Sequence, residues 1–215
     1  MRCAYLLLAS ACLAGCAVGD GSVEEFDSEA ASNPADKYAV TCNYPVKADD
    51  TIETLAERMG DAASIEDVHI GEGEFEPGVV LWGKDPARRI DVIFEIDRDK
   101  TAQYLEFIEG SNWTVGGVGI GDTATQVQAV NGRPFSFLGF EWDLGGSVTD
   151  FNGGRLGQFD GECAPRVGLG YGDMTMAVAD RFIGDVAISS DAQGLPADRL
   201  VVWRLGVDFQ RSTTQ

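Results

Sequence analysis

Histidine and basic residues are scarce in this chain, and their scarcity argues against several kinds of site. The 215 residues include one histidine and 16 lysine or arginine residues against 35 acidic ones, which gives a formal net charge of −19 at pH 7. Nucleic-acid binding needs lysine and arginine clustered opposite the phosphates, so the composition argues against that partner. It argues equally against electrostatic attachment to anionic headgroups. Zinc sites need several histidine or cysteine ligands, so we predict no metal site and no cofactor.

Long apolar runs are also few, and the one at the N-terminus is the most specific signal. Met1-Arg2 supplies a positive start, and Cys3–Leu13 is apolar but shorter than the roughly 20 residues that span a bilayer, which is typical of a secretory signal. The run ends in Leu13-Ala14-Gly15-Cys16, which resembles the lipobox of bacterial lipoproteins. The resemblance implies that residues 1–15 are removed and that Cys16 carries lipid. Ala17 follows where an inner-membrane retention signal places aspartate, which implies outer-membrane delivery. The alternative is an ordinary signal peptide that contains Cys16.

Two cysteines, Cys42 and Cys163, remain after that leader. An exported protein meets an oxidising compartment, so the pair predicts one disulfide. Metal binding by the pair is a poorer explanation, because the chain has no C-x-x-C motif and only one histidine.

The rest of the chain divides into a tether and a domain. Residues 16–39 are rich in glycine, serine, alanine and acidic residues and hold too few apolar side chains to stay folded, so they predict a disordered acidic spacer. Residues 40–215 suit a single domain with one core.

Apolar periodicity predicts two short helices among many strands. Ile52, Leu55, Ala56 and Met59 share one helical face, with Asp50 or Thr51 as the cap and Gly60 at the end. A second helix is expected over 124–130, between Asp122-Thr123 and Asn131-Gly132. We therefore predict an α+β fold with short helices packed on a mainly antiparallel sheet. Strands are expected over 40–46, 64–74, 78–83, 90–96, 103–108, 135–142, 147–151, 166–171, 181–188 and 200–209.

The two helix segments, 50–60 and 122–132, align without gaps. They share an Asp-Thr start, an aliphatic residue four positions after the threonine, and a closing glycine, and a strand–turn–strand follows each. Two helix–meander repeats would explain this, and convergence is the alternative. The pattern resembles the tandem repeats of the outer-membrane assembly lipoprotein and β-lactamase-inhibitor group, although only Gly132-Arg133-Pro134 keeps their Gly-x-Pro exit. The stretch from Asp50 to Gly146, with GVVLWGKDPARR, NGRPF and GFEWDLGG, also resembles an uncharacterised family of bacterial lipoproteins. That resemblance implies no activity.

The single histidine and the glycine-rich stretch do not predict catalysis. A nucleophilic triad could use His69 as its base, but no serine lies in a G-x-S-x-G elbow. We interpret His69 as a strand or loop residue without catalytic duty. Gly117–Gly121 lacks the lysine of a phosphate-binding loop and is interpreted as a bend before a helix.

Alternating carboxylates offer a further candidate site. Glu72, Glu74 and Glu76 would line one side of an extended chain, where three carboxylates can hold Ca²⁺. The D-x-D-x-D-G calcium loop is absent, so a solvated strand edge guarded by charge and by Pro77 is favoured. Asp97 and Asp99 receive the same interpretation.

A paired-carboxylate hydrolase is an alternative from a different class. Glu141 and Asp143 flank Trp142 and would share one strand face, with Trp113 and Trp203 as stacking surfaces for sugars. Any strand produces that spacing, however, and Trp142 is expected in the core. We predict no catalytic residue.

The sequence therefore favours a lipid-anchored, non-catalytic binding or scaffolding module that faces the periplasm, with another envelope protein as its partner. The alternatives are a carboxylate-dependent hydrolase of envelope glycans and an inhibitor of another enzyme; the inhibitor rests on the repeat resemblance alone.

Overall fold

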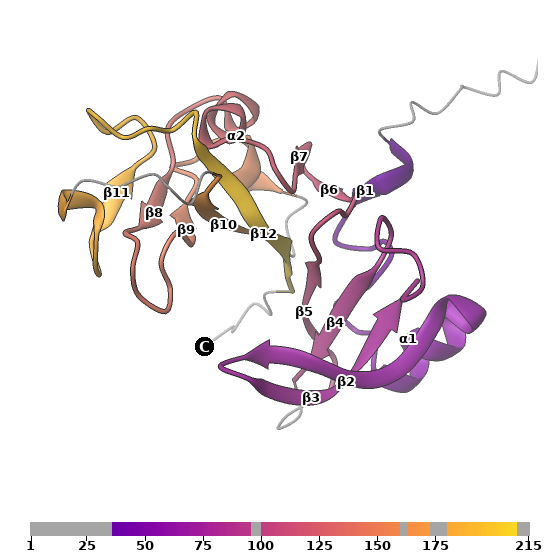
Figure 1. Ribbon diagram of the computed structural model, residues 1–215. Coiled ribbons are helices and arrows are strands. Elements are labelled where there is room, and N and C mark those ends of the chain that lie inside the picture. The colour runs from indigo at the N-terminus through magenta and orange to yellow at the C-terminus, as the bar shows by residue number, and fades with distance from the viewer. Residues whose placement is uncertain (1–35, 96–99, 160–162, 173–179, 210–215) are drawn as a thin grey trace, which may run out of the picture. The chain divides into compact units, whose positions relative to one another are not determined.

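The computed structural model describes residues 36–95, 100–159, 163–172 and 180–209 (Figure 1). The described residues form two short α-helices and mostly antiparallel sheets, so the predicted α+β class is confirmed. Four short 3-10 segments accompany them: η1 (Asp36–Tyr38), η2 (Gly60–Ala62), η3 (Arg155–Gln158) and η4 (Asp180–Phe182).

Helix α1 (Ile52–Met59) has the predicted bounds. The Thr51 hydroxyl accepts a hydrogen bond from the Thr54 backbone N–H (3.2 Å), and the Thr54 hydroxyl accepts one from the Thr51 N–H (2.7 Å). This capping box satisfies two donors of the first turn that have no partner within the helix. Asp50, the other predicted cap, is buried and pairs with Arg58 instead.

The strands after α1 form a meander in which each strand lies antiparallel to the one before it. Figure 1 shows these four strands together beside α1, and the pairing places β2 at the edge of the sheet. They are β2 (Ala63–Gly71), β3 (Glu74–Leu81), β4 (Ile90–Phe94) and β5 (Ala102–Phe107).

The last strand, β12 (Leu200–Asp208), connects the two halves of the chain. It pairs antiparallel with β5 on one side and with β10 (Ala164–Tyr171) on the other, which gives a six-stranded sheet in the order β10-β12-β5-β4-β3-β2. The alternating pattern over 200–209 therefore predicted this strand correctly.

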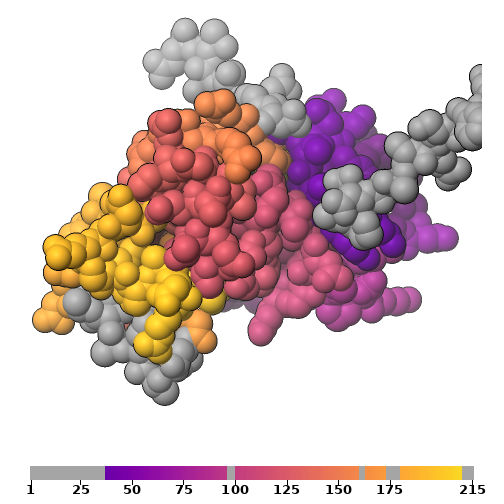
Figure 2. Space-filling model, turned by 90° about the horizontal axis from the view of Figure 1, so that it is seen from above, coloured from indigo at the N-terminus to yellow at the C-terminus, as the bar shows by residue number. Residues whose placement is uncertain are grey.

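Two small sheets flank helix α2 (Ala124–Asn131) in the sequence. In the first, β1 (Ala39–Val40) pairs parallel with β6 (Thr114–Val115), and β6 pairs antiparallel with β7 (Val118–Gly119). In Figure 2 the indigo segment around β1 lies against pink atoms of the chain's middle, as that pairing requires. The second sheet has the order β11-β8-β9, from β11 (Ala187–Ser189), β8 (Ser136–Leu138) and β9 (Val148–Asp150).

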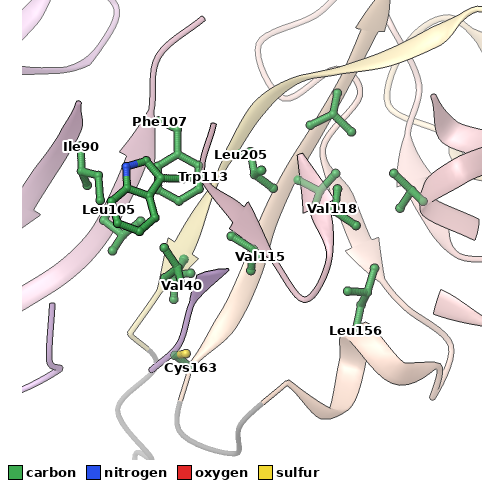
Figure 3. Close-up of a cluster of buried hydrophobic side chains, with 14 of the residues drawn as sticks. Val40, Ile90, Leu105, Phe107, Trp113, Val115, Val118, Leu156, Cys163 and Leu205 are labelled. Carbon is green, nitrogen blue, oxygen red and sulfur yellow. The ribbon is translucent and has the colours of Figure 1, made fainter. Parts of the chain in front are cut away.

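One buried cluster occupies the packed face of the six-stranded sheet. It contains alternate residues of β3, β4, β5 and β12 together with Leu55 of α1 and Val127 of α2, so both helices contribute to the same core. Trp113 lies in this cluster, beside Phe107 and Leu105 (Figure 3), and is 1% exposed. Its indole N–H donates to the carbonyl of Arg88 (2.7 Å), which satisfies the one polar atom of the ring.

The opposite face of the sheet, called the open face below, buries far less. Its only described cluster is Val68, Val80 and Ile93, and no helix residue belongs to it. An antiparallel sheet can leave one face to solvent in this way. No helix in the described ranges is long and apolar enough to cross a membrane.

The predicted disulfide is present. Cys42 and Cys163 are bonded across 121 residues, and both are buried in the main cluster. The bond ties the segment after β1 to the start of β10, so it joins the N-terminal end of the domain to the six-stranded sheet.

Most predicted strands differ from the observed ones by one to three residues at an end, and the predicted segment 64–74 is interrupted by the hairpin turn at residues 72–73. Three other predicted segments depart further. Residues 40–46 turn instead, because Thr41 and Tyr44 pair with each other across a tight turn (2.9 Å). The strand predicted over 135–142 ends at Leu138. Beyond it, the N–H groups of Gly139 and Phe140 donate to the carbonyls of Val186 and Phe182 and do not pair with β9. Residues 181–188 form the end of η4, a loop and the start of β11.

The expected tether ends earlier than predicted. Its last residues form η1 and the start of β1, and the Tyr38 ring lies edge-on against Trp113 with centroids 5.5 Å apart. The rest of residues 16–39, and the leader before it, lie outside the described residues.

The two helices have the same type of N-terminal cap, but the strands that follow them belong to different sheets. Helix α2 repeats the capping box of α1, with Thr123 and Gln126, and ends at Gly132 in the left-handed region (φ 81°). The meander after α1 joins the large sheet, whereas β8 and β9 belong to a separate small sheet. The likeness of the two segments is therefore local.

Removing the disulfide should lower the free energy of unfolding. The chain-entropy model gives about 4–5 kcal/mol as an upper figure for a loop of this length. We expect the Cys42→Ala/Cys163→Ala variant to lose about 3–5 kcal/mol in urea unfolding compared with the oxidised protein. Equal urea midpoints would show that the packing around the bond, and not the bond, holds these segments together.

Candidate functional site

Strand register places a group of charged and aromatic side chains on the open face. Arg166 of β10 lies opposite Gly206 of β12, which lies opposite Glu106 of β5. Tyr104 and Asp208 form the next open-face pair. Side chains alternate between the two faces of a strand, and the residues between these positions are buried in the core, so all of these side chains point away from it.

The Arg166 guanidinium is held from three directions. Nη2 lies 3.1 Å from Oε1 of Glu106, Nη1 lies 3.1 Å from Oδ1 of Asp208, and Cζ lies 4.2 Å from the centroid of the Tyr104 ring. Gly206 has no side chain, so Arg166 can cross β12 to reach Glu106 on β5.

The surroundings of Arg166 and Tyr104 raise the pKa values of both side chains. Burial lowers the pKa of Arg166, but the carboxylates of Asp208 and Glu106 outweigh it and raise the pKa above its usual value. Burial, followed by the negative charge of Glu106, raises the pKa of Tyr104, so its hydroxyl stays neutral. We call Arg166, Glu106, Asp208 and Tyr104 the Arg166 cluster; its guanidinium stays charged and its phenol stays neutral near neutral pH.

A bulge adds Trp203 and Arg204 to the same face. The register between β10 and β12 shifts near Gly168, so two consecutive side chains of β12 both avoid the core. The indole ring of Trp203 packs over Gly168 and Gly170; a Cβ at Gly170 would lie 2.7 Å from it. The Arg204 guanidinium lies 4.6 Å from the ring centroid, and Trp203 remains 50% exposed. Arg204 has no carboxylate partner among the described residues.

Two adjoining hollows make a groove over the Arg166 cluster. Their volumes are about 300 and 230 Å³, and both include Arg166, Arg204 and Leu144. The hairpin between β2 and β3 borders one hollow, and Pro165 and Ser147 border the other. Leu144 on the rim is 52% exposed. The groove therefore combines fixed charges with exposed apolar side chains.

A larger hollow of about 560 Å³ lies elsewhere, beside Trp82. The Trp82 ring packs on Trp113 (5.4 Å between centroids), and Arg88 lies 4.5 Å from its centroid. Trp113 and Arg88 therefore already contact the Trp82 ring, which is the aromatic group that a ligand in this hollow would meet. We therefore regard the groove, which gathers more polar and aromatic groups, as the better candidate site.

The structure places the predicted histidine and carboxylates as follows. His69 is on β2, as predicted, and its side chain is exposed. Its ring meets Phe75 edge-on, with centroids 5.3 Å apart, and it lines the groove. Glu72 is at the hairpin turn, while Glu74 and Glu76 are on β3, so the three do not share one strand side as expected. β3 is an inner strand, and the sheet edge is β2. No group of three or more potential metal ligands occurs among the described residues, and Asp97 and Asp99 lie outside them.

Gly117–Gly121 forms the β6–β7 turn, β7 and a second turn, which together lead to the Thr123 cap. The interpretation as a bend before a helix is confirmed.

The geometry expected for the paired carboxylates is wrong. Glu141 and Asp143 lie in the loop between β8 and β9, because β8 ends at Leu138, and Glu141 has a left-handed backbone (φ 66°). Asp143 lines the groove and Glu141 does not. Burial, and then the negative charge of nearby Glu141, raise the pKa of Tyr171 to about 12. The two carboxylates therefore have different surroundings.

The expected stacking surfaces are also partly wrong. Trp113 is buried and cannot meet a sugar. Trp142 is half-buried, and its indole N–H donates to the carbonyl of Gly139 (2.8 Å), so it supports the loop. Only Trp203 is largely exposed among these three.

The sequence did not single out the Arg166 cluster. Arg166 and Asp208 are 42 residues apart, and only strand register brings them together. The one available signal was the alternation of Arg204, Gly206 and Asp208 along the polar side of β12.

No model of a known protein family, no curated protein and no solved structure matches this chain. The family resemblances noted in the sequence stay predictions.

Substituting Gly206 should loosen the strand pair that supports the groove. A Cβ there would lie 2.0 Å from the carbonyl oxygen of Leu105, so β12 would have to move away from β5. We expect Gly206→Ala to lose about 1–3 kcal/mol in urea unfolding. Gly119→Ala is the matched control, because its nearest neighbours would be 3.8 Å from the added carbon. Equal stability of the two variants would contradict the argument.

Proposed function

We propose that this protein is a non-catalytic binding module, anchored by lipid at the outer membrane and facing the periplasm. The observation that carries the proposal is the set of side chains in and beside the groove. Tryptophan, tyrosine and arginine are the residues that contribute most to protein–protein binding energy, and Trp203, Tyr104, Arg166 and Arg204 gather on one open sheet face.

The side chains in and beside the groove are also preorganised. Arg166 is held by two carboxylates and a ring, and Trp203 rests on two glycines. Side chains that are already ordered lose little entropy on binding, which favours affinity. Leu144 and Trp203 offer apolar surface, and Arg204 offers a cation without a carboxylate partner in the described part of the chain. The partner that fits is an envelope protein with an apolar patch beside an acidic side chain.

The anchor rests on the sequence around Cys16, with the lipobox-like Leu13-Ala14-Gly15 before it and Ala17 after it. Export agrees with the disulfide, because disulfides persist in oxidising compartments. The hydrolase has no comparable support, since Glu141 and Asp143 do not line one groove. The inhibitor hypothesis stays a prediction from resemblance.

Substituting the proposed lipid-bearing cysteine should release the protein from membranes. We expect wild type to enter the detergent phase of a Triton X-114 partition and Cys16→Ser to remain aqueous, because an acyl anchor supplies about 0.8 kcal/mol per buried methylene. Cys12→Ser, a cysteine within the proposed leader, is the control and should behave as wild type. Mass spectrometry of the mature N-terminus tests the same point; a terminus without lipid would refute the anchor.

Substitutions in and beside the groove should weaken partner capture. The experiment compares crosslinked envelope pull-downs of wild type, Trp203→Ala/Arg204→Ala and the exposed control Lys47→Ala. We expect the double variant to recover at least about tenfold less of the partner, since each interface hot spot contributes roughly 2 kcal/mol or more. Equal recovery by the double variant, or no reproducible partner for wild type, would count against the proposal.

A further inference from the structure

Strand β2 forms one edge of the six-stranded sheet. It pairs only with β3 among the described strands. The β2–β3 hairpin also extends past β4, because β4 pairs with β3 only from Val79 to Leu81. An edge strand presents unpaired N–H and C=O groups that can accept another strand.

Hydrogen-bond alternation identifies the groups at this edge. The Trp82 N–H donates to the carbonyl of Ala62 (2.7 Å), just before β2 begins. In an antiparallel pair every second residue is hydrogen-bonded to the partner strand, so Ser64, Glu66 and Val68 of β2 are bonded to β3. The N–H and C=O groups of the intervening residues Ile65, Asp67 and His69 therefore point away from β3. Pro77 lies opposite Asp67, so its nitrogen points toward the β4 side and not toward β2. Pairing with β4 begins only at Val79, so no hydrogen bond is lost because proline has no N–H.

The hairpin is acidic and partly apolar. No lysine or arginine occurs from residue 59 to residue 83. Ile65 and Phe75 are 59% and 62% exposed and lie on one side of the hairpin with His69, whose ring meets Phe75 edge-on. The carboxylates of the hairpin are Glu66, Asp67, Glu72, Glu74 and Glu76.

Charge decides which strand this edge can accept. A second copy of the chain would bring Glu66 and Asp67 against the same two residues, and like charges directly opposite each other destabilise a strand pair. A strand that alternates basic with apolar residues could place its basic side chains on the face of Glu66 and cover Ile65 on the other face with its apolar side chains. The acidic residues therefore disfavour edge-to-edge pairing of two copies of this chain and favour pairing with a positively charged strand.

We propose that the outer edge of β2 accepts an extended basic segment of another protein as an additional strand, with lysine or arginine alternating with β-branched residues. The proposal goes beyond the groove, because it uses the outward backbone groups of Ile65, Asp67 and His69 at the sheet edge, although the His69 side chain also lines the groove.

The test uses two labelled ten-residue peptides and fluorescence anisotropy. One alternates lysine with valine, and the other alternates lysine with proline, which keeps the charge but cannot pair as a strand. We expect the valine peptide to bind the full chain at least about tenfold more tightly, because only it can form the backbone hydrogen bonds.

Two variants separate backbone pairing from charge. Asp67→Pro removes one outward N–H, and Asp67→Asn keeps that N–H but removes the charge. We expect about tenfold weaker binding for Asp67→Pro and a smaller loss for Asp67→Asn. Trp203→Ala/Arg204→Ala should bind the peptide as wild type does, so failure of the groove proposal and failure of this one are distinguishable.

Hydrogen exchange provides a measurement that needs no variant. Saturating valine peptide should slow exchange at the amides of Ile65, Asp67 and His69, whereas the amide of Glu66, bonded to β3, should change little. Four outcomes would overturn the proposal: no binding of either peptide, equal binding of both, unchanged exchange at these amides, or a homodimer that Asp67→Pro dissociates.

Discussion

The pairing of β12 with β5 is the interaction on which the rest of the structure depends. It joins strands from the end of the chain to the meander that follows α1, and it turns two partial sheets into one sheet of six strands. The approach is close enough that only glycine fits at position 206. The same glycine lets Arg166 cross from β10 to Glu106 on β5, so one residue serves both the backbone pairing and the polar cluster above it.

The sheet has different chemistry on its two faces. Both helices and Trp113 contribute to one buried cluster on the packed face, and the disulfide joins that cluster as well. The open face has no comparable cover among the described residues, and Arg166 pairs there with Asp208 and Glu106. A stable core on one side thus permits a rigid, partly apolar surface on the other, which is the arrangement that suits a binding module.

Local signals predicted the local structure well. Capping residues and apolar spacing gave α1 its correct bounds, and strict alternation predicted β12, because both patterns depend on neighbours in the sequence. The strand over 135–142 failed since Gly139 and Phe140 bond to Val186 and Phe182, partners that no local pattern reveals. That error also misplaced Glu141 and Asp143, and the hydrolase geometry depended on them.

From its residues alone, the chain determined its acidic charge, the α+β class, both helices and the Cys42–Cys163 pair, because composition, periodicity and the number of available cysteines decide those features. Only the tertiary structure decided that Arg166, Glu106, Asp208 and Tyr104 meet, and that β2 rather than β3 forms the sheet edge. Strand order and register are long-range choices, set by which apolar faces pack together, and a single strand carries no record of its neighbours.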